Sequence, residues 1–495
     1  MKVRTMLRLP RFVALSAAAW MVGCGSDTPP TPAPEVDAGS DVAAPSEASP
    51  EVEAGRPDTS VESSAANDAA IDTATDTRSE ADLDAANEAG DARTGLEQTA
   101  PYVTSKIPYP TANPHTPEKA TLGKILFWEE QLSSHDKMAC GTCHRSAAGG
   151  SDPRSSEPLS LGAGPNGVKG DADDVHGGRG VVRCDATGAA KSDPIYGAAA
   201  QITARKPPTY LDAMFFDTLF WDGRATDSFK DPVSGAVLID THGALESQAA
   251  GPPTNDVEMS CENYTWTMIA DKLAKVTTKP LALAKNIPAD MAKAIADHPT
   301  YLDLFQWVYG PREITPAKIL FAIATHERTL LSNQTPWDRF NSGDRTALSA
   351  PQQRGLALFN LKARCAVCHI PPTFHDNKFH NVGFGDPNLD KGLAVVSTKA
   401  DDLGKMKTPS LRNVGLRAAG GLMHNGTGNG ATLQTVITAY NQGGSSKDHI
   451  DIEMKQLDLT QVEFNDLFDF VENGLTDPRV KDEVAPFDRP KLSTE

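Results

Sequence analysis

Residues 137–144 read Lys137-Met138-Ala139-Cys140-Gly141-Thr142-Cys143-His144, and most of the chain is interpreted from them. In this Cys-x-x-Cys-His pattern two thiols stand three positions apart and an imidazole follows directly. The pattern is typical of a c-type haem, because the thiols can bind the haem vinyl groups while the histidine ligates the iron. Half of a zinc site and a thioredoxin-like redox pair are the alternatives.

A second copy of the pattern, at residues 365–369, favours haem over both alternatives. Two independent copies in an exported chain predict two covalently bound haem c groups. The attaching thiols and ligating imidazoles are expected to be Cys140, Cys143 and His144 in the first copy and Cys365, Cys368 and His369 in the second.

The first residues of the chain resemble an export signal. Residues 1–24 have a basic start and a short apolar run, 12–22, which is too short to span a bilayer as a mature helix. Met21-Val22-Gly23-Cys24 is similar to a bacterial lipobox, and a plain cleaved signal is the alternative. We expect a periplasmic protein that is anchored to a bacterial membrane by lipid at Cys24.

Residues 25–98 contain no Phe, Trp or Tyr and are rich in Asp, Glu, Ala, Ser, Thr and Pro. Such a segment buries too little apolar surface to offset chain entropy, so we predict a disordered acidic linker. Its eighteen acids against three arginines account for most of the net charge of −18. The acidic balance therefore lies mostly in the linker and says little about the partner of the folded part. No nucleic-acid partner is expected.

The remaining residues are too many for one core and suit two domains, 99–332 and 333–495. Helix starts are predicted at Thr116-Pro117, at Thr315-Pro316 and after Thr460. Strand alternation is scarce, and long Gly/Pro-rich connections suit a fold in which haem supplies much of the core. We predict a mainly α protein with two cytochrome c-like haem domains and long irregular loops.

A local pattern recurs in the two halves. Gly123-Lys124-Ile125-Leu126-Phe127 precedes the first haem motif, and Gly355-Leu356-Ala357-Leu358-Phe359 precedes the second. Each predicts an amphipathic helix that packs an apolar face against its own haem.

Two further cysteines, Cys184 and Cys261, lie in the same part of the chain. In an oxidising compartment two leftover thiols favour a disulfide, and free thiols are the alternative. The bond would tie the loop after the first haem motif to the segment that carries Glu258.

Several unconnected motifs, in one order along the chain, resemble those of the bacterial di-haem cytochrome c peroxidase and MauG family. The resemblance covers most of the body, from Leu122 to about Gly444. It implies an oxidoreductase whose N-terminal haem reacts with hydrogen peroxide while its C-terminal haem stores or relays electrons. The motifs are Leu122–Phe127, Phe220–Ala225, Val257–Met259, His326–Leu330, Phe379–Gly383 and Leu411–Val414.

The resemblance also implies roles around the first haem. Gln248 and Glu258 match the family's distal pair, in which a tuned carboxylate moves a proton and an amide orients peroxide without changing charge. Trp221 matches the tryptophan between the haems, and Arg224 is expected to contact haem propionates. Without the resemblance, Glu258 would be a solvated loop carboxylate and Trp221 a core side chain.

The chain departs from the family at the first haem. Classical members place a histidine after the first motif, where it caps the iron, whereas this chain has Ala163 there. We therefore expect an open distal face, a feature that MauG shares. His176, further along the chain, is the alternative cap.

The sixth ligand of the second haem is usually a methionine in this family and a tyrosine in MauG. Tyr440 matches that position, with Met423 and Met454 as competitors. A phenolate favours higher oxidation states of iron than a thioether does, so Tyr440 would favour storage of an oxidising equivalent. His380 and His424 are expected to form hydrogen bonds in the same pocket.

A third departure concerns calcium, which family members hold with an asparagine that follows an arginine. In this chain Lys206 follows Arg205, and an ammonium cannot ligate a cation. We expect the lysine to replace the positive charge of the ion, which makes calcium doubtful. His326, in the helix that connects the two halves, is expected to be structural.

These observations predict a di-haem c-type peroxidase that reduces hydrogen peroxide at the His144 haem. Electrons would come through the second haem from a small redox protein, such as a cytochrome c or a cupredoxin. One alternative is a MauG-like enzyme that oxidises a side chain of a partner protein. The other is a non-enzymatic di-haem electron carrier, which would not need Gln248 and Glu258.

Overall fold

The computed structural model describes residue 102 and residues 106–495, except 165, 172, 276, 445, 447 and 448. The predicted signal, the predicted lipid attachment at Cys24 and the predicted acidic linker lie outside these residues. Within the described part, none of the helices has the length and apolar character needed to cross a lipid bilayer.

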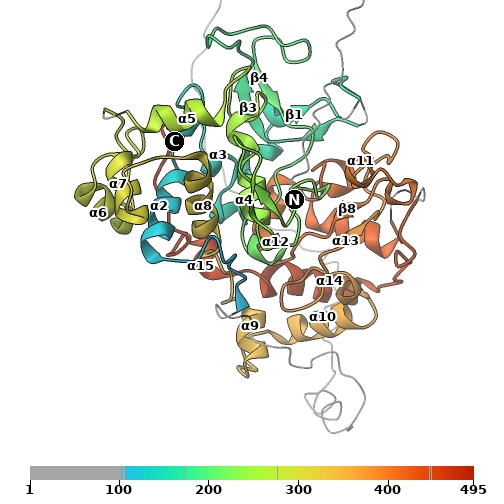
Figure 1. The fold of residues 1–495 in the computed structure, drawn as a ribbon. Helices are drawn as coiled ribbons and strands as arrows, with labels where there is room; N and C mark the ends of the chain where they lie inside the picture. Colours follow the sequence, from blue (N-terminus) through green and yellow to red (C-terminus); the bar gives the residue numbers. More distant parts are fainter. Residues whose placement is uncertain are drawn as a thin grey trace, which may run out of the picture. The chain divides into compact units, whose positions relative to one another are not determined.

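The described chain is mainly helical, as predicted, and its small sheets each pair two antiparallel strands (Figure 1). The helices are α2 (Pro117–Phe127), α3 (Cys140–Cys143), α4 (Ala244–Ala249), α5 (Trp266–Leu273), α6 (Ala289–Asp297), α7 (Tyr301–Tyr309), α8 (Pro316–Glu327), α9 (Pro336–Asn341), α10 (Ala350–Asn360), α11 (Ala394–Ser397), α12 (Val414–Arg417), α13 (Leu433–Asn441), α14 (Gln461–Asp469) and α15 (Pro478–Lys481). The strand pairs are β1 (Leu161–Gly162) with β2 (Val175–His176), β3 (Arg179–Val182) with β4 (Ala200–Ile202), β5 (Phe229–Lys230) with β6 (Val237–Ile239), and β7 (Phe379–His380) with β8 (Met406–Lys407).

The three helix starts predicted from Thr are confirmed. Thr116 and Thr315 cap α2 and α8, because each side chain accepts a hydrogen bond from the backbone N–H three residues on, and a proline follows each cap. Thr460 caps α14 and forms a capping box with Glu463.

The recurring Gly-to-Phe pattern has a structural counterpart in each half. Gly123 lies where α2 crosses α8, and a Cβ added there would be 1.8 Å from the Ala322 carbonyl oxygen. Gly355 lies where α10 crosses α14, and a Cβ there would be 2.1 Å from the Asp466 carbonyl oxygen. Because neither glycine has a Cβ, the helix before each haem motif can approach its partner helix until the two backbones touch.

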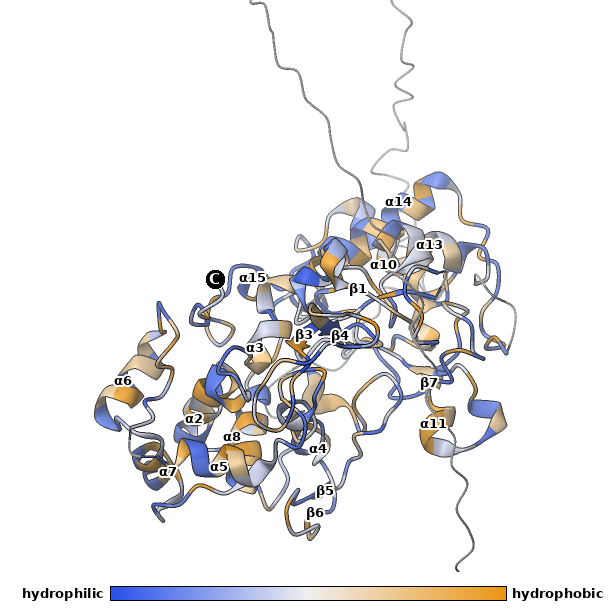
Figure 2. Ribbon diagram, turned by 90° about the horizontal axis from the view of Figure 1, so that it is seen from above, coloured by the Kyte–Doolittle hydropathy of each residue, from blue (hydrophilic) through white to orange (hydrophobic). Residues whose placement is uncertain are grey.

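The buried hydrophobic side chains of the described chain form three clusters, and the two larger ones build separate cores. In Figure 2 the helices of one, α2, α5, α7 and α8, lie apart from α10, α13 and α14 of the other. The first is built on α2, α5, α7 and α8, and the second runs from Trp337 to Leu475. The division of the body into two domains stays a prediction. Along the chain, buried residues pass from the first cluster to the second between Leu330 and Trp337.

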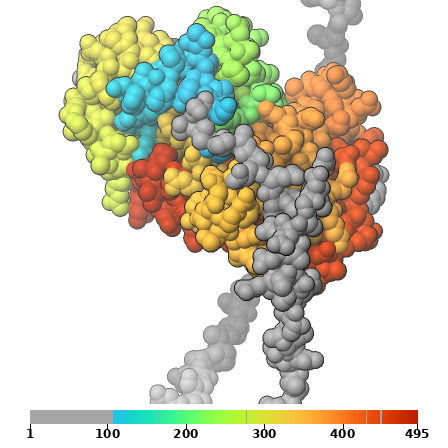
Figure 3. Space-filling model, turned by 90° about the horizontal axis from the view of Figure 1, so that it is seen from below, coloured from blue at the N-terminus to red at the C-terminus, as the bar shows by residue number. Residues whose placement is uncertain are grey.

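The end of the chain packs on the first core, although the sequence predicts it as part of the second domain, 333–495. Val480, Phe487 and Leu492 are fully buried members of the first cluster. Asp488 also pairs with Lys124 of α2 at 2.8 Å. Figure 3 shows this red segment beside the blue surface of the first half.

The predicted disulfide is confirmed: Cys184 and Cys261 are bonded, with their Cα atoms 4.8 Å apart. Cys184 follows β3, and Cys261 follows the loop that carries Glu258. The bond therefore closes a loop of 77 residues against that segment.

The close helix crossings predict an unusual response to alanine. Gly→Ala in an open helix stabilises by up to about 1 kcal/mol, but at Gly123 or Gly355 the added methyl group must push the helices apart. Each variant should lower the free energy of unfolding by about 1–3 kcal/mol, measured by urea denaturation followed by circular dichroism. Val462→Ala on the exposed face of α14 is the control, with a change within about 0.5 kcal/mol. A stabilised Gly123→Ala variant would contradict the crossing.

Candidate functional site

A cavity of about 620 Å³ lies beside the first haem motif. It is lined by side chains that are far apart in the sequence, and it brings together every first-haem residue predicted from the sequence. These are Cys140, Cys143, His144, Ala163, Trp221, Arg224, Gln248 and Glu258.

The His144 imidazole is held in an orientation that suits metal ligation. Its Nδ1 lies 3.2 Å from the Gly150 carbonyl oxygen, so Nδ1 carries the proton and Nε2 keeps its lone pair. Burial lowers the pKa of His144, which favours the neutral ring. Burial also raises the pKa of the Cys140 thiol to about 12 and that of Cys143 further.

The distal pair reaches the cavity from two different elements. Gln248 lies in the short helix α4, and Glu258 lies in a loop folded around Asn255, whose side-chain Oδ1 accepts the Glu258 N–H at 3.0 Å. Burial raises the pKa of Glu258, and the nearby Arg224 guanidinium opposes part of that rise. Glu258 therefore holds a proton more readily than an exposed glutamate does.

Ala163 is 5% exposed and faces the same cavity. His176, the alternative cap, lies in β2 opposite Leu161 of β1 and lines neither this cavity nor the second one among the described residues. Its backbone N–H donates to the Asn425 carbonyl at 2.8 Å.

A second cavity, of about 200 Å³, lies beside the second haem motif. His369 is held as His144 is, with Nδ1 3.0 Å from the Phe374 carbonyl oxygen, and burial lowers its pKa to about 4. Tyr440, on α13, lines this cavity, and so do both competing methionines, Met423 and Met454. The choice among these three ligands therefore stays a prediction.

His380 and His424 also line the second cavity. His380 lies between two carboxylates, with Nδ1 2.5 Å from Asp451 and Nε2 2.8 Å from Asp376. His326 lies away from both cavities, buried on α8 with its ring 5.7 Å from that of Phe127.

Trp221 lines both cavities and is 8% exposed. Its indole N–H donates to the Lys206 carbonyl at 2.8 Å, and its own carbonyl accepts the Lys407 N–H at 2.8 Å. Arg224 pairs with Asp222 at 3.0 Å and stacks over Phe220, at the edge of the first cavity. The role of Arg224 toward haem propionates stays a prediction.

Lys206 also lines both cavities and is 3% exposed. Its Nζ donates to Ser151 Oγ at 2.6 Å, and burial lowers its pKa to about 8. An ammonium with a hydroxyl partner offers no oxygen cage of the kind calcium needs. The doubt about calcium at this site stays a prediction.

Sequence reasoning missed Glu327, which ends α8 and lines the first cavity. It is 4% exposed, and its Oε2 has no hydrogen-bond partner among the described residues. Burial raises its pKa to about 8, although Arg328 acts in the opposite direction. The sequence does contain a signal for its burial. Glu327 lies four residues after Ile323 and eight after Ile319, so its carboxylate falls on the apolar face of the predicted helix.

Comparison with known proteins places the chain in a family. The model of the di-haem cytochrome c peroxidase family matches residues 117–346. The methylamine utilization protein MauG of Methylophilus methylotrophus is 30% identical over 369 residues, which cover 74% of this chain and 85% of MauG. The cytochrome-c peroxidase IdrP1 of Denitromonas iodatirespirans is 28% identical over 445 residues, 83% of this chain and 95% of that protein.

A solved structure, that of a MauG-like protein associated with microbial copper homeostasis, shares the fold. The two structures superpose with a TM-score of 0.53 at 23% sequence identity. The match covers 79% of this chain and 97% of the MauG-like protein. The chain belongs to the di-haem cytochrome c peroxidase and MauG family, which confirms the family and the class of enzyme, an oxidoreductase, predicted from the sequence.

The buried Glu327 predicts a pH dependence of stability. Its pKa rises from 4.5 to about 8 on folding, so between these values the folded protein binds one proton more than the unfolded chain. Its contribution to the free energy of unfolding therefore falls by about 1.4 kcal/mol per pH unit as the pH rises through this window. Glu327→Gln should remove that loss, so that the variant gains stability over the parent between about pH 5 and about pH 8.

Urea denaturation of parent and variant across this pH range measures the difference. Glu313→Gln, an exposed glutamate near the start of α8, is the control and should leave the pH dependence unchanged. Parallel pH profiles for the parent and Glu327→Gln would contradict the prediction.

Proposed function

We propose that the chain is a di-haem c-type peroxidase that reduces hydrogen peroxide in the first cavity, with electrons delivered through the second. The observation that carries the proposal is the first cavity itself, which places a Cys-x-x-Cys-His motif and the Gln248/Glu258 pair around one space. Trp221, in the wall of both cavities, supports the electron path.

The residues present suit two covalently bound haem c groups. Each cavity offers two thiols and an imidazole whose Nδ1 is committed to a backbone carbonyl, leaving Nε2 for iron. Haem bound in this way supplies a redox-active iron that can deliver electrons to peroxide.

The chain's own side chains account for the proton chemistry. Reduction of hydrogen peroxide to two waters consumes two electrons and two protons, and one proton must first move from one peroxide oxygen to the other. Glu258, with its raised pKa, can accept and return that proton. The Gln248 amide can orient peroxide without changing charge, and the small Ala163 side chain leaves room for it.

The electron path would use the wall between the cavities. The Trp221 indole in that wall could carry an oxidising equivalent from one side to the other, and Tyr440, if it holds the second iron, would favour its storage there. Electrons then come from a small redox protein, a cytochrome c or a cupredoxin. The two haem domains, 99–332 and 333–495, are part of this proposal.

The setting of the reaction is also part of the proposal. A signal at residues 1–24, lipid at Cys24 and an acidic linker at residues 25–98 would hold the catalytic body in the periplasm at a bacterial membrane.

A MauG-like reaction, in which a side chain of a partner protein supplies the electrons, is the second candidate. Tyr440 in the second cavity favours it, because a phenolate supports storage of an oxidising equivalent. The 30% identity to MauG of Methylophilus methylotrophus also supports a MauG-like reaction.

Removing the acid–base group tests the proposal directly. Glu258→Gln keeps the shape of the side chain but cannot take up a proton, so peroxide consumption should slow by about 10²–10⁴-fold. Asp256→Asn removes an exposed carboxylate two residues away and should leave the rate unchanged. Consumption by Glu258→Gln at the parent rate would remove Glu258 from the mechanism.

Spectroscopy separates the enzyme from a di-haem electron carrier. We expect electron paramagnetic resonance of the oxidised protein to show one high-spin iron; two low-spin irons that persist after partial reduction would indicate a carrier. When peroxide is added, fast turnover with reduced cytochrome c indicates the peroxidase. A long-lived near-infrared band with both irons oxidised indicates the MauG-like path.

A further inference from the structure

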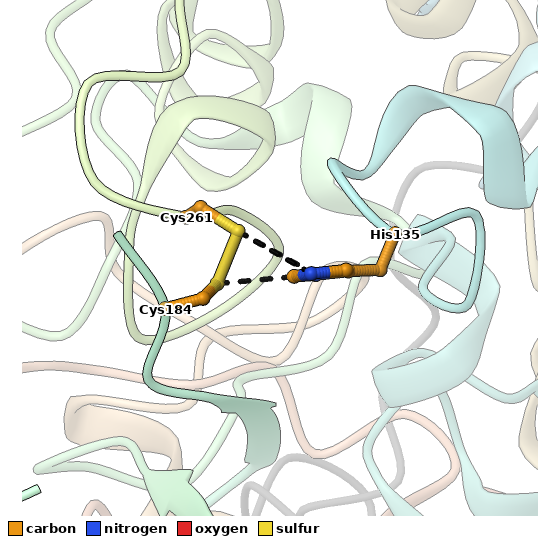
Figure 4. Close-up of side chains that lie close together, drawn as sticks. All are labelled: His135, Cys184 and Cys261. Atoms are coloured by element: carbon orange, nitrogen blue, oxygen red, sulfur yellow. Dashed lines mark hydrogen bonds between the residues drawn. A yellow bond between two sulfur atoms is a disulfide. The ribbon is translucent and has the colours of Figure 1, made fainter. Parts of the chain in front are cut away.

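Outside the two cavities, an imidazole lies against the disulfide (Figure 4). His135 Nδ1 is 3.6 Å from Cys261 Sγ and 3.9 Å from Cys184 Sγ. The two sulfurs belong to buried residues, whereas His135 is exposed. The ring therefore meets the disulfide from the solvent side.

The two nitrogen–sulfur separations are close to those of a sulfur- and nitrogen-ligated metal site, and the two sulfurs, which are bonded to each other here, would have to move apart. Zn²⁺ binds thiolate at about 2.3 Å and imidazole at about 2.0 Å, which places neighbouring ligand atoms of a tetrahedron roughly 3.5 Å apart. One ligand atom from each of His135, Cys184 and Cys261 lies within 4.8 Å of the others. The imidazole thus stands at about the right distance from both sulfurs.

We infer that, once the disulfide is reduced, Cys184, Cys261 and His135 form a binding site for a thiophilic d¹⁰ cation such as Zn²⁺. Two thiolates and one imidazole supply three ligands, and the exposed position of His135 lets water supply the fourth.

The change of state balances with a dithiol as reductant. The Sγ–Sγ bond breaks, each sulfur gains one electron and one proton, and the dithiol becomes a disulfide. Zn²⁺ then displaces the two thiol protons and binds both sulfurs.

The backbone keeps the three ligands together without the disulfide. The Glu262 N–H donates to the Cys184 carbonyl at 3.1 Å, which joins the two cysteine segments. The Cys261 N–H donates to Ser134 Oγ at 3.0 Å, which joins Cys261 to the residue before His135. The metal would therefore enter a site whose ligands are already adjacent.

The same serine favours the thiolate. Ser134 Oγ donates to Cys261 Sγ at 3.3 Å, and a hydrogen bond to sulfur stabilises its anionic form.

Zinc binding by the intact haem protein tests the inference. After treatment with a dithiol and removal of the reagent, the protein is incubated with Zn²⁺ alone, desalted and analysed for metal. We expect one more zinc per chain than in the untreated, disulfide-bonded protein. Zn²⁺ should also raise the melting temperature of the reduced protein and leave that of the oxidised protein unchanged.

Variants separate this site from other zinc-binding groups. His135→Ala should weaken binding to the reduced protein at least about tenfold, whereas His115→Ala, which removes another exposed imidazole, should have no effect. The Cys184→Ser, Cys261→Ser double variant should lose the additional zinc.

Four outcomes would overturn the inference. They are equal zinc content in the reduced and oxidised proteins, equal content in the double variant, unchanged affinity in His135→Ala, and loss of the folded circular dichroism spectrum on reduction. The last result would mean that the ligands do not stay together without the disulfide.

Discussion

The hydrogen bond from the Trp221 indole to the Lys206 carbonyl, 2.8 Å long, holds together the wall between the two cavities. Both residues line both cavities. Their backbones reach across to the second half of the chain, because the Lys206 N–H donates to the His424 carbonyl and the Trp221 carbonyl accepts from Lys407. A shift of either segment would therefore displace side chains that line both cavities.

The same wall contains two buried lysines. The Lys206 Nζ has the Ser151 hydroxyl as partner, and the Lys407 Nζ lies 3.0 Å from the centre of the Phe216 ring. Burial lowers the pKa of both lysines, because it disfavours the charged form, and it does so more strongly at Lys407. A cation in a region of low dielectric acts on nearby charge more strongly than one in water does. The protonation state of these two amines therefore sets how much positive charge stands between the cavities.

Much of the fold could be predicted because its signals are local. A threonine before a proline marked two helix starts, and the pattern repeated before each haem motif marked the helices α2 and α10. The disulfide followed from the count of cysteines. The family resemblance supplied the distal pair, and the first cavity contains both members.

What could not be predicted depends on distant partners. Glu327 and Lys206 are charged residues whose burial follows from packing that no short stretch encodes. The choice among Tyr440, Met423 and Met454 also depends on three-dimensional placement, since all three line one cavity. The position of the chain end on the first core was missed because Val480, Phe487 and Leu492 have no regular spacing.

That last contact makes the two cores differ in how much of the chain each one needs. The second core needs nothing beyond Leu475, so it can form without the chain end. The first core lacks three buried side chains until synthesis has passed Leu492. Although domains generally fold as units with the N-terminal one first, here the half that is made first is completed last, and until then it exposes an apolar surface that only the far end of the chain can cover.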